Sequence, residues 1–250
     1  MCSVTWTHPR AGGLVLCFNR DEKHTRPAGL PPCVWGAGSF LAPRDAAGGG
    51  TWMAVRRDGV VLALLNHYPA GFSPAAAAPS RGALIPSLAA EEEKLSTITL
   101  RPHLRPGMNP FRLLCLMPGD QRAQLFTWDG TMLTQRRLAA RHTGFLTSSS
   151  WNTAAVLTSR HAVFRQWRKR HPQPSLDDLV AFHRETENPH GAAWAVCMSR
   201  EDARTVSLDI VHLHEGAAAM THHHRPHDAP GFACKTHRAE LRLTSCSNAS

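Results

Sequence analysis

Apolar and polar positions near the start of the chain follow the patterns of two paired strands. Residues 2–7 alternate, Pro9 to Gly13 have the composition of a turn, and Leu14 to Phe18 are continuously apolar. Alternation indicates a strand with one polar face, whereas a continuous apolar run is typical of a strand that is covered on both faces. The pattern therefore predicts a hairpin whose second strand lies inside the protein.

A second hairpin is predicted over residues 51–66. Its arms, residues 51–56 and 60–66, are separated by Arg57-Asp58-Gly59, and the Asp-Gly step is a strong turn signal. The second arm begins with VVLALL and is again apolar on both faces. Two sets of strands buried on both faces require layers of structure above and below a sheet.

Helical and strand patterns alternate in the rest of the chain. Helices are predicted to begin at Arg81 and to cover residues 91–95, 153–171 and 176–185, the last with Ser175 as its N-cap. Strands are predicted over residues 111–117, 123–128, 131–136, 194–198, 205–213 and 218–223. Because strands flank the helical block, we expect a single α+β domain over residues 1–224, followed by a loosely structured tail over residues 225–250.

Composition narrows the class of protein. The chain has 250 residues, of which 42% are hydrophobic, so it can bury a core; this excludes disorder throughout, collagen and a pure coiled coil. No stretch approaches 18 consecutive apolar residues, and residues 1–6 lack the profile of a secretory signal. We therefore expect a cytoplasmic protein without stable membrane insertion.

The formal net charge of +9 raises the question of a polyanionic partner. Only four of the 28 basic residues are lysine, and the arginines are scattered, which is typical of a compositional bias. The one basic run, Arg165 to His171, falls on a predicted helix whose Val163, Phe164 and Trp167 would face the core. We interpret the run as a solvated helix face and expect no nucleic-acid partner.

The seven cysteines include no CxxC pair, and without a secretory context disulfides are not expected. Cys17, Cys115 and Cys197 lie in apolar runs and are predicted to be buried. Cys2 differs from them. Removal of Met1, which methionine aminopeptidase performs before a small second residue, would make Cys2 the mature N-terminus.

The first hairpin brings Cys2 to a polar run. If the turn is centred near Ala11, residue numbers of antiparallel partners sum to about 22, so Cys2 lies opposite Arg20. Asn19 and Asp21 then fall within diagonal reach. Four polar residues, ending with Glu22, directly follow a strand that is otherwise apolar. Packing alone does not readily explain this crowding opposite a residue that can act as a nucleophile.

This arrangement suits the chemistry of an N-terminal nucleophile. A free α-amine has a pKa of about 7.7 to 8.0 and can accept the proton of its own thiol. The Arg20 guanidinium would favour the thiolate, Asp21 would hold the amine by a charge-assisted hydrogen bond, and Glu22 would brace Arg20. The alternative is a salt-bridge cluster at the end of a hairpin, beside an inert cysteine.

Several short motifs extend the pattern along the chain. They are MCSVTW at 1–6, CFNRDE at 17–22, RPA at 26–28, WG at 35–36, GGTW at 49–52, LLN at 64–66, SRG at 80–82, LTSSSW at 146–151 and ARTVS at 203–207. In this order the motifs resemble those of the NRDE family, also called the transport and Golgi organization protein 2 family. The densest part of the resemblance covers the first third of the chain.

The resemblance implies an N-terminal-nucleophile-hydrolase-like fold: a four-layer αββα sandwich of two stacked, mainly antiparallel sheets. The chain is also distantly similar to the penicillin acylase and bile-salt hydrolase group, in which the catalytic Cys follows Met1. The similarity implies Cys2 as the nucleophile, Asp21 as the partner of the amine, and the backbone around Asn66, His67 and Tyr68 as the oxyanion donors. Residues 19–22 and 66–68 would then bind a small-molecule amide, ester or thioester.

Ser148 departs from the family pattern. The acylases and many NRDE proteins have Asn at the third position of the LTS segment, where this chain has Ser148. A hydroxyl is a poorer-placed oxyanion donor than a carboxamide, which argues against amide hydrolysis. The Arg of the acylases is also shifted in register relative to Arg20, so its role does not transfer directly.

A different function is also implied by the resemblance, because family members are associated with haem mobilisation and with lipid or membrane-traffic phenotypes. The alternative is therefore a non-enzymatic haem or lipid carrier that uses the same cleft. The chain has no CxxCH motif, so any haem would be held non-covalently.

The C-terminal histidines form a second candidate site. If residues 215–218 make a turn, His212 would lie across from one of His222 to His224, close enough to share Zn²⁺ or haem iron, with His214 nearby. Their position beside the polar tail favours surface histidines instead, and we expect no metal site. Gly48 to Gly50 are predicted to form a turn. Trp52, Trp151 and Trp194 are predicted to be core or pocket-wall aromatics.

Overall fold

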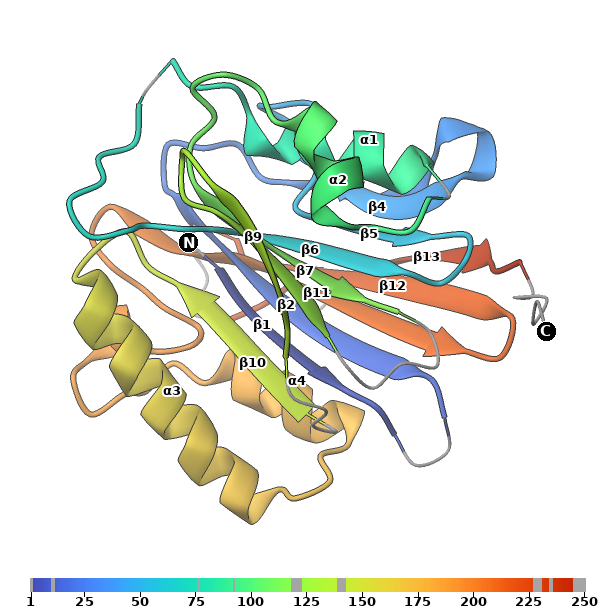
Figure 1. Ribbon diagram of the computed structural model, residues 1–250. Coiled ribbons are helices and arrows are strands. Elements are labelled where there is room, and N and C mark those ends of the chain that lie inside the picture. The colour runs from blue at the N-terminus through green and yellow to red at the C-terminus, as the bar shows by residue number, and fades with distance from the viewer. Residues whose placement is uncertain are drawn as a thin grey trace.

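Two antiparallel sheets lie face to face in the computed structural model, with helices on their outer faces (Figure 1). The structure describes residues 2–9, 12–75, 77–91, 93–117, 123–138, 143–226, 231–233 and 236–244. This architecture is the four-layer αββα sandwich implied by the sequence, and the α+β class is confirmed.

One sheet has six strands and carries the start of the chain. In spatial order its strands are β10 (Thr143–Ser148), β1 (Cys2–Thr7), β2 (Leu14–Lys23), β11 (Ala203–His214), β12 (Ala217–His224) and β13 (Thr236–Arg242). The predicted hairpin register is confirmed, because Cys2 pairs with Arg20. Since β1 also pairs with β10, the start of the chain lies between two strands.

The other sheet has seven strands in sequence order. They are β3 (Leu30–Trp35), β4 (Phe40–Arg44), β5 (Met53–Arg56), β6 (Val61–Asn66), β7 (Phe111–Leu116), β8 (Gln124–Trp128) and β9 (Leu133–Arg137). The predicted hairpin around Arg57-Asp58-Gly59 is confirmed as β5 and β6. Because every pairing in this sheet is antiparallel, short connections suffice between most neighbouring strands.

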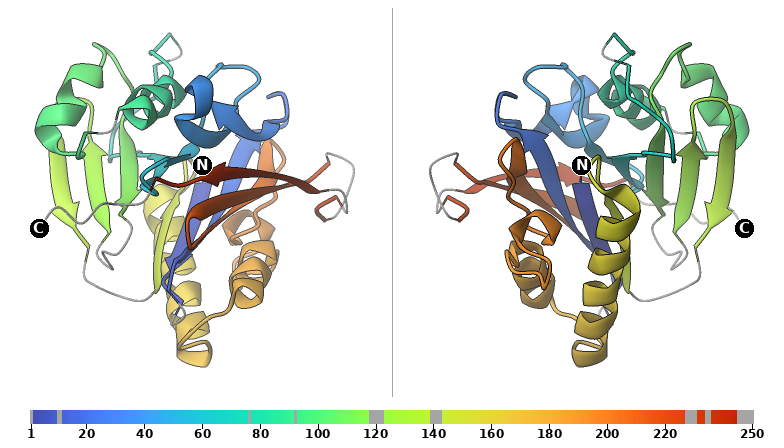
Figure 2. Two further views of the ribbon diagram at one scale, coloured as in Figure 1. Left: turned by 90° about the vertical axis from the view of Figure 1, so that its right-hand side faces the viewer. Right: turned by 90° about the vertical axis from the view of Figure 1, so that its left-hand side faces the viewer.

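Helices cover the outer face of each sheet (Figure 2). The seven-stranded sheet is covered by α1 (Leu84–Ala90) and α2 (Thr97–Leu100), and the six-stranded sheet by α3 (Thr153–Arg170) and α4 (Leu176–Arg184). Short 3₁₀ turns occupy Gly36–Gly38, Arg81–Ala83, Arg101–His103 and Ala192–Trp194. In the described part of the chain, no helix has both the length and the apolar character needed to cross a membrane.

The core has three apolar layers, and β2 shows why its sequence is continuously apolar. Leu16 and Phe18 pack between the two sheets, whereas Val15 and Cys17 pack on the opposite face against the α3 and α4 layer. Successive side chains of a strand point to opposite faces, so a strand between two apolar layers needs apolar residues at every position. Cys115 and Cys197 are also buried, as predicted.

Some predicted elements differ from the structure. The described residues of 91–95 are not helical; the helix begins after Ser96, whose side chain makes a capping box with Thr99. The strand predicted over residues 194–198 is absent: Trp194 ends a 3₁₀ turn, and residues 195–197 form bends. The expected loose tail after Arg225 contains β13, an edge strand whose polar pattern gave no apolar signal.

Candidate functional site

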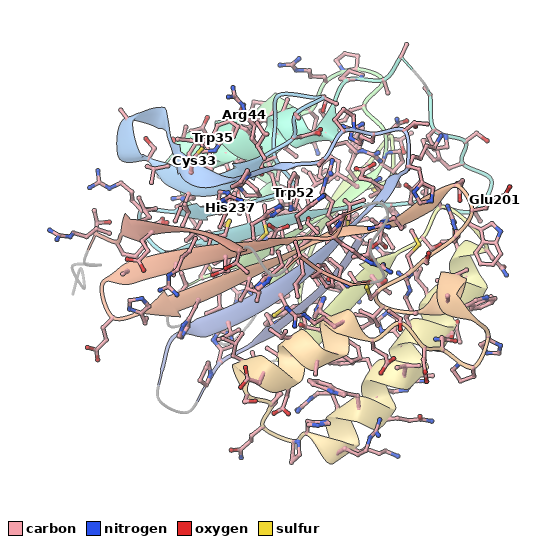
Figure 3. All side chains as sticks on the ribbon, turned by 180° about the vertical axis from the view of Figure 1, so that it is seen from behind. Cys33, Trp35, Arg44, Trp52, Glu201 and His237 are labelled. Atoms are coloured by element: carbon pink, nitrogen blue, oxygen red, sulfur yellow. The ribbon has the colours of Figure 1, made fainter. Side chains whose placement is uncertain are left out.

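A cavity of about 410 Å³ lies beside the N-terminal strand. Its lining includes Cys2, Arg20, Glu22, Arg26, Asp45, Trp52, Asn66 and Arg81. These residues come from β1, β2 and the loop after it, β6, the segments around β4 and β5, and the turn that precedes α1. Trp52 is buried and lies near the middle of the view in Figure 3. The fold thus gathers Cys2, Arg20, Glu22 and Asn66 from the sequence-predicted set into one cavity.

Strand pairing places Cys2 between Arg20 and Ser148. Both are its direct cross-strand partners, so the three side chains share the face of the sheet that looks toward the second sheet. The Cys2 backbone nitrogen donates a hydrogen bond of 3.0 Å to Ser148 Oγ. Ser148 therefore contacts the nitrogen that becomes the α-amine if Met1 is removed.

The Cys2 thiol is buried, and nearby charges and a hydrogen bond also change its pKa. Burial raises its pKa to about 11, and the Asp21 carboxylate acts in the same direction. A positive charge at the amino terminus and a hydrogen bond from the Asp21 backbone amide lower the pKa. While the chain retains Met1, the thiol is therefore protonated near neutral pH.

Two arginines and two carboxylates form an ion-pair network on the cavity wall. Arg20 lies 3.2 Å from Asp45 Oδ1 and 3.2 Å from Glu22 Oε1. Arg26 also contacts Asp45 and lies 3.6 Å from the same Glu22 oxygen. The Arg20 guanidinium lies 4.5 Å from the centroid of the Trp52 ring, which fixes its plane further. Glu22 thus braces Arg20, as predicted from the sequence.

Asp45 and Arg26 were missed as site residues in the sequence analysis. Arg26 lies in the RPA motif, which belongs to the ordered set of family motifs, so the sequence did offer a signal for this residue. Asp45 follows β4, and no local pattern singled it out. The contacts join segments that are well apart in the chain.

Asp21 faces away from the cavity, toward the α3 layer. Thr205 Oγ1 donates a 2.6 Å hydrogen bond to Asp21 Oδ1, and Arg160 Nη1 lies 3.8 Å from Asp21 Oδ2. Burial raises the pKa of Asp21, while Arg160 and the positive amino terminus lower it. Arg160 is only 1% exposed and also donates to Thr147 Oγ1. The contact of the Asp21 carboxylate with a processed amine stays a prediction.

Asn19 lies on the same helix-facing side of β2 as Asp21 and does not line the cavity. It is fully buried, and its Nδ2 donates to the carbonyl oxygens of His183 and Val196 at 2.8 and 3.0 Å. These bonds tie β2 to the end of α4 and to the segment that follows it. The geometry gives Asn19 a role in holding the strand against its helical layer.

The segment after β6 reaches the cavity through Asn66. Its Nδ2 donates a 2.9 Å hydrogen bond to the Tyr68 hydroxyl, which leaves a second amide hydrogen available. The backbone amide of His67 donates to Pro110 O, so that amide is already engaged. His67 and Tyr68 are not among the residues that line the cavity. Of the three sequence candidates, Asn66 is the one whose side chain borders it.

Two glycine-containing motifs meet at the cavity rim. Thr51 N donates to Gly82 O at 3.1 Å, which joins the GGTW segment to the SRG segment. A Cβ at Gly50 would lie 2.3 Å from Gly82 O, so only glycine permits this approach. The junction sets Arg81 at the cavity, where its Nη1 donates to Pro110 O. In the described part of the chain, no carboxylate lies within ion-pair distance of Arg81.

A buried polar group supports Trp52 from behind. Trp52 Nε1 donates to Asp209 Oδ2 at 3.0 Å, Ser207 Oγ donates to the same oxygen at 3.1 Å, and His222 Nδ1 lies 2.6 Å from Asp209 Oδ1. Burial opposes a charge on His222, but Asp209 outweighs it and raises the pKa of His222. Asp209 therefore holds the Trp52 indole in place, and the Arg20 guanidinium packs against the face of that ring.

The proposed histidine pairing is corrected by the strand register. The turn is Glu215-Gly216, so His212 pairs with Ala219 and His222 pairs with Asp209. His212 and His214 are exposed, whereas His222 is buried and is not a surface histidine. Among the described residues, no group of three His, Cys, Asp or Glu side chains is placed to hold a metal ion.

Few of the described side chains that line the Cys2 cavity could ligate a metal ion or haem iron. Of the residue types that ligate haem iron or metals, its lining contains Cys2, Glu22 and Asp45 among the described residues. Both carboxylates already pair with arginines. Cys2 is therefore the one side chain of this lining suited to bind haem iron axially.

Solved structures with the same architecture define the class of fold. The N-acylethanolamine-hydrolyzing acid amidase ortholog of Caenorhabditis elegans superposes with a TM-score of 0.54 at 10% identity, covering 84% of this chain and 92% of that one. A C2A mutant of the conjugated bile acid hydrolase from Clostridium perfringens gives a TM-score of 0.55 at 10% identity, covering 96% and 92%. The fold is that of the N-terminal-nucleophile hydrolases.

Sequence comparison assigns the family. The model of the Transport and Golgi organisation 2 family matches residues 1–211, and the chain belongs to this family. The family predicted from the ordered motifs is thus confirmed. A comparison with curated proteins found no match.

Proposed function

We propose that this protein is a cysteine N-terminal-nucleophile hydrolase or acyltransferase, with Cys2 as its nucleophile after Met1 removal. The observation that carries the proposal is the position of Cys2: it borders the 410 Å³ cavity, and its backbone nitrogen lies 3.0 Å from Ser148 Oγ. The fold supports the proposal, as does the C2A substitution in the bile acid hydrolase structure, which replaces a cysteine at the second position of that protein.

Removal of Met1 would change the chemistry of Cys2 directly. In the unprocessed chain the Cys2 nitrogen belongs to a peptide bond and has no basic lone pair. Burial also holds the pKa of the thiol at about 11, so little thiolate forms. A free α-amine has a pKa of about 7.7 to 8.0 and would supply the missing base beside the thiol.

The proposed reaction proceeds through a thioester. The Cys2 amine accepts the thiol proton, and the sulfur forms a bond with the carbonyl carbon of the substrate. The tetrahedral intermediate then collapses: the bond to the leaving nitrogen, oxygen or sulfur breaks, and the amine returns the proton to that group. Water, deprotonated by the same amine, attacks the thioester, which releases a carboxylic acid and restores the thiol. An amine or alcohol in place of water gives acyl transfer.

Three groups of side chains support these steps. The free amide hydrogen of Asn66 is the candidate donor to the oxyanion, since Ser148 is engaged with the Cys2 nitrogen. Arg20, held by Glu22 and Asp45, provides a fixed positive charge at the cavity. Arg81 has no carboxylate partner among the described residues, which favours a substrate that carries an anionic group near the reacting carbonyl.

Site-selective alkylation tests the proposal, because the chain contains an internal reference thiol. Cys33 is exposed, whereas burial raises the pKa of Cys17 and Cys115. Intact-mass measurement should first show that Met1 is absent. Peptide mapping after treatment with iodoacetamide should then show that Cys2 is labelled faster than the exposed Cys33 below pH 8, while Cys17 and Cys115 stay unmodified.

A chain that retains Met1 is the matched control, and its Cys2 should react much more slowly. Equal labelling of Cys2 with and without Met1 would contradict a role for the amine as base. Retention of Met1 in the purified protein, or a Cys2 that stays unreactive after its removal, would remove the basis of the proposed catalysis.

A further inference from the structure

A second cavity, of about 790 Å³, opens where the two sheets diverge beside α3. We call it the β9–β10 groove, because β9 and β10 are edge strands of the two sheets that border it. Its apolar lining comes from Trp6, Leu125, Leu138, Phe145, Leu146 and Phe164. None of the described residues lines both this groove and the cavity of Cys2.

Gly144 gives the groove a continuous aromatic and aliphatic wall. It is the cross-strand partner of Trp6, and a Cβ at Gly144 would lie 2.0 Å from an atom of the Trp6 ring. The indole therefore lies across the backbone of β10, in space that any other residue would occupy. Phe145, on the next position, packs against Phe164 at a ring-centroid distance of 4.9 Å.

The ionisable side chains of the described lining are all basic. They are three arginines, Arg112 on β7, Arg136 on β9 and Arg165 on α3, together with His161 on α3. No Asp or Glu occurs in the described lining, and in the described part of the chain none lies within 4.0 Å of these three arginines. Arg112 is half-buried, so its charge is partly withdrawn from water, and none of the described carboxylates offsets it.

The basic groups also repel one another. Burial lowers the pKa of Arg112, and Arg136 lowers it further. Burial lowers the pKa of His161 too, with added contributions from Arg165 and Arg112. Crowded like charges beside apolar surface cost free energy in the unliganded protein, and an anion bound between them would relieve that cost.

We propose that the β9–β10 groove binds a long-chain carboxylate, with the carboxylate at Arg112 and Arg136 and the hydrocarbon chain along the wall of Trp6, Leu125 and Leu146. The choice of occupant follows from charge complementarity: the lining combines apolar side chains with guanidinium groups that have no carboxylate partner among the described residues. The volume falls within the range of about 300 to 1,000 Å³ that is usual for small-molecule sites. Arginine suits this role because its planar fork binds a carboxylate through two hydrogen bonds.

Calorimetric titration of the full chain with decanoate tests the proposal. Arg112→Gln and Arg136→Gln should each weaken binding about tenfold or more, as expected for the loss of a charge-assisted hydrogen bond. Arg170→Gln is the matched control, since Arg170 is an exposed arginine of α3 outside the groove. It should change affinity less than about twofold, a change of under 0.5 kcal/mol.

Two further arms distinguish the groove from other sources of binding. Decanol has the same chain without the charge and should bind at least about tenfold more weakly than decanoate. A Cys2→Ala variant should bind decanoate as the wild type does, because Cys2 does not line the groove. This result is independent of whether the proposed hydrolase activity exists. Circular dichroism of each variant confirms that it is folded.

The contrary results are equally specific. Absence of saturable decanoate binding would overturn the proposal, as would equal affinity of the wild type and both groove variants. Equal binding of decanol and decanoate would show that the arginines do not recognise a carboxylate. Loss of binding in Cys2→Ala would assign the ligand to the other cavity.

Discussion

Replacing Gly50 by alanine tests the junction that holds the GGTW and SRG segments together at the cavity rim. A Cβ at this position would lie 2.3 Å from Gly82 O and 2.4 Å from Gly82 C, both of them backbone atoms. Ordinary non-bonded contacts are about 3.5 Å long, so the two backbones must separate by about 1 Å. No side-chain rotation relieves the clash.

The cost can be worked from the bonds that such a shift disrupts. The hydrogen bond from Thr51 N to Gly82 O, at 3.1 Å, spans this junction, and the bond from Asp45 N to Gly50 O, at 2.7 Å, closes the turn that holds Gly50. Each is worth about 1 kcal/mol, and overpacking adds about 1 to 3 kcal/mol. We expect Gly50→Ala to lower the free energy of unfolding by about 3 kcal/mol or more.

Gly49→Ala is the matched control, one residue earlier. Its φ is +68°, and a Cβ there meets no atom within 4 Å, so the cost is left-handed strain of about 1 kcal/mol. Urea unfolding followed by tryptophan fluorescence measures both variants against the wild type. If Gly50→Ala is no more destabilising than Gly49→Ala, the close backbone approach does not exist in the protein.

Three other predictions concern buried charges and cofactor binding. Arg160→Met should destabilise the protein by about 3 kcal/mol or more in urea unfolding, because it leaves the buried carboxylate of Asp21 without its cation; a loss below about 1 kcal/mol would argue against the pair. The His222→Asn variant should have a lower free energy of unfolding than the wild type at low pH. Since Asp209 raises the folded-state pKa of His222, the stabilisation is complete below about pH 6.5 and declines as pH rises through the folded-state value, so the difference between the two proteins should narrow from pH 6.5 upward. A constant difference would refute this linkage. For a hydrolase, haemin titration should give no Soret shift that depends on Cys2; a shift abolished by Cys2→Ala would favour the haem-carrier alternative.

Local patterns predicted most of the strands in the middle of the sheets, but they missed β4 and the edge strands β3 and β10. The turn length of the first hairpin was enough to predict that Cys2 pairs with Arg20, because pairing in a hairpin is set by its turn. The N-cap of α4 at Ser175 was also readable, and in the structure Ser175 forms a capping box with Asp178. The edge strands gave weaker signals: β3 contains two prolines, and β13 is polar along most of its length.

The site was only partly readable for a geometrical reason. Arg20 faces the cavity, but Asn19 and Asp21 point to the other side of the same strand, since side chains alternate. Arg160 and Asp209 escaped notice because their partners lie far away in sequence and no local motif links them. The fold decides whether a charged residue is buried beside its counter-ion. The pattern of apolar and polar residues along a helix does not reveal this.

Trapping an acyl-enzyme is the most direct measurement of catalysis by Cys2. The chain without Met1, in a Cys33→Ser background, is mixed with p-nitrophenyl acetate, quenched in acid and digested. Peptide mass spectrometry then locates any acetyl group. A hydrolase with an N-terminal nucleophile should carry one acetyl group on Cys2 and release p-nitrophenol in a burst, while the chain that retains Met1 should do neither. Absence of the adduct, or an adduct of equal yield when Met1 is retained, would contradict catalysis by Cys2 and its amine.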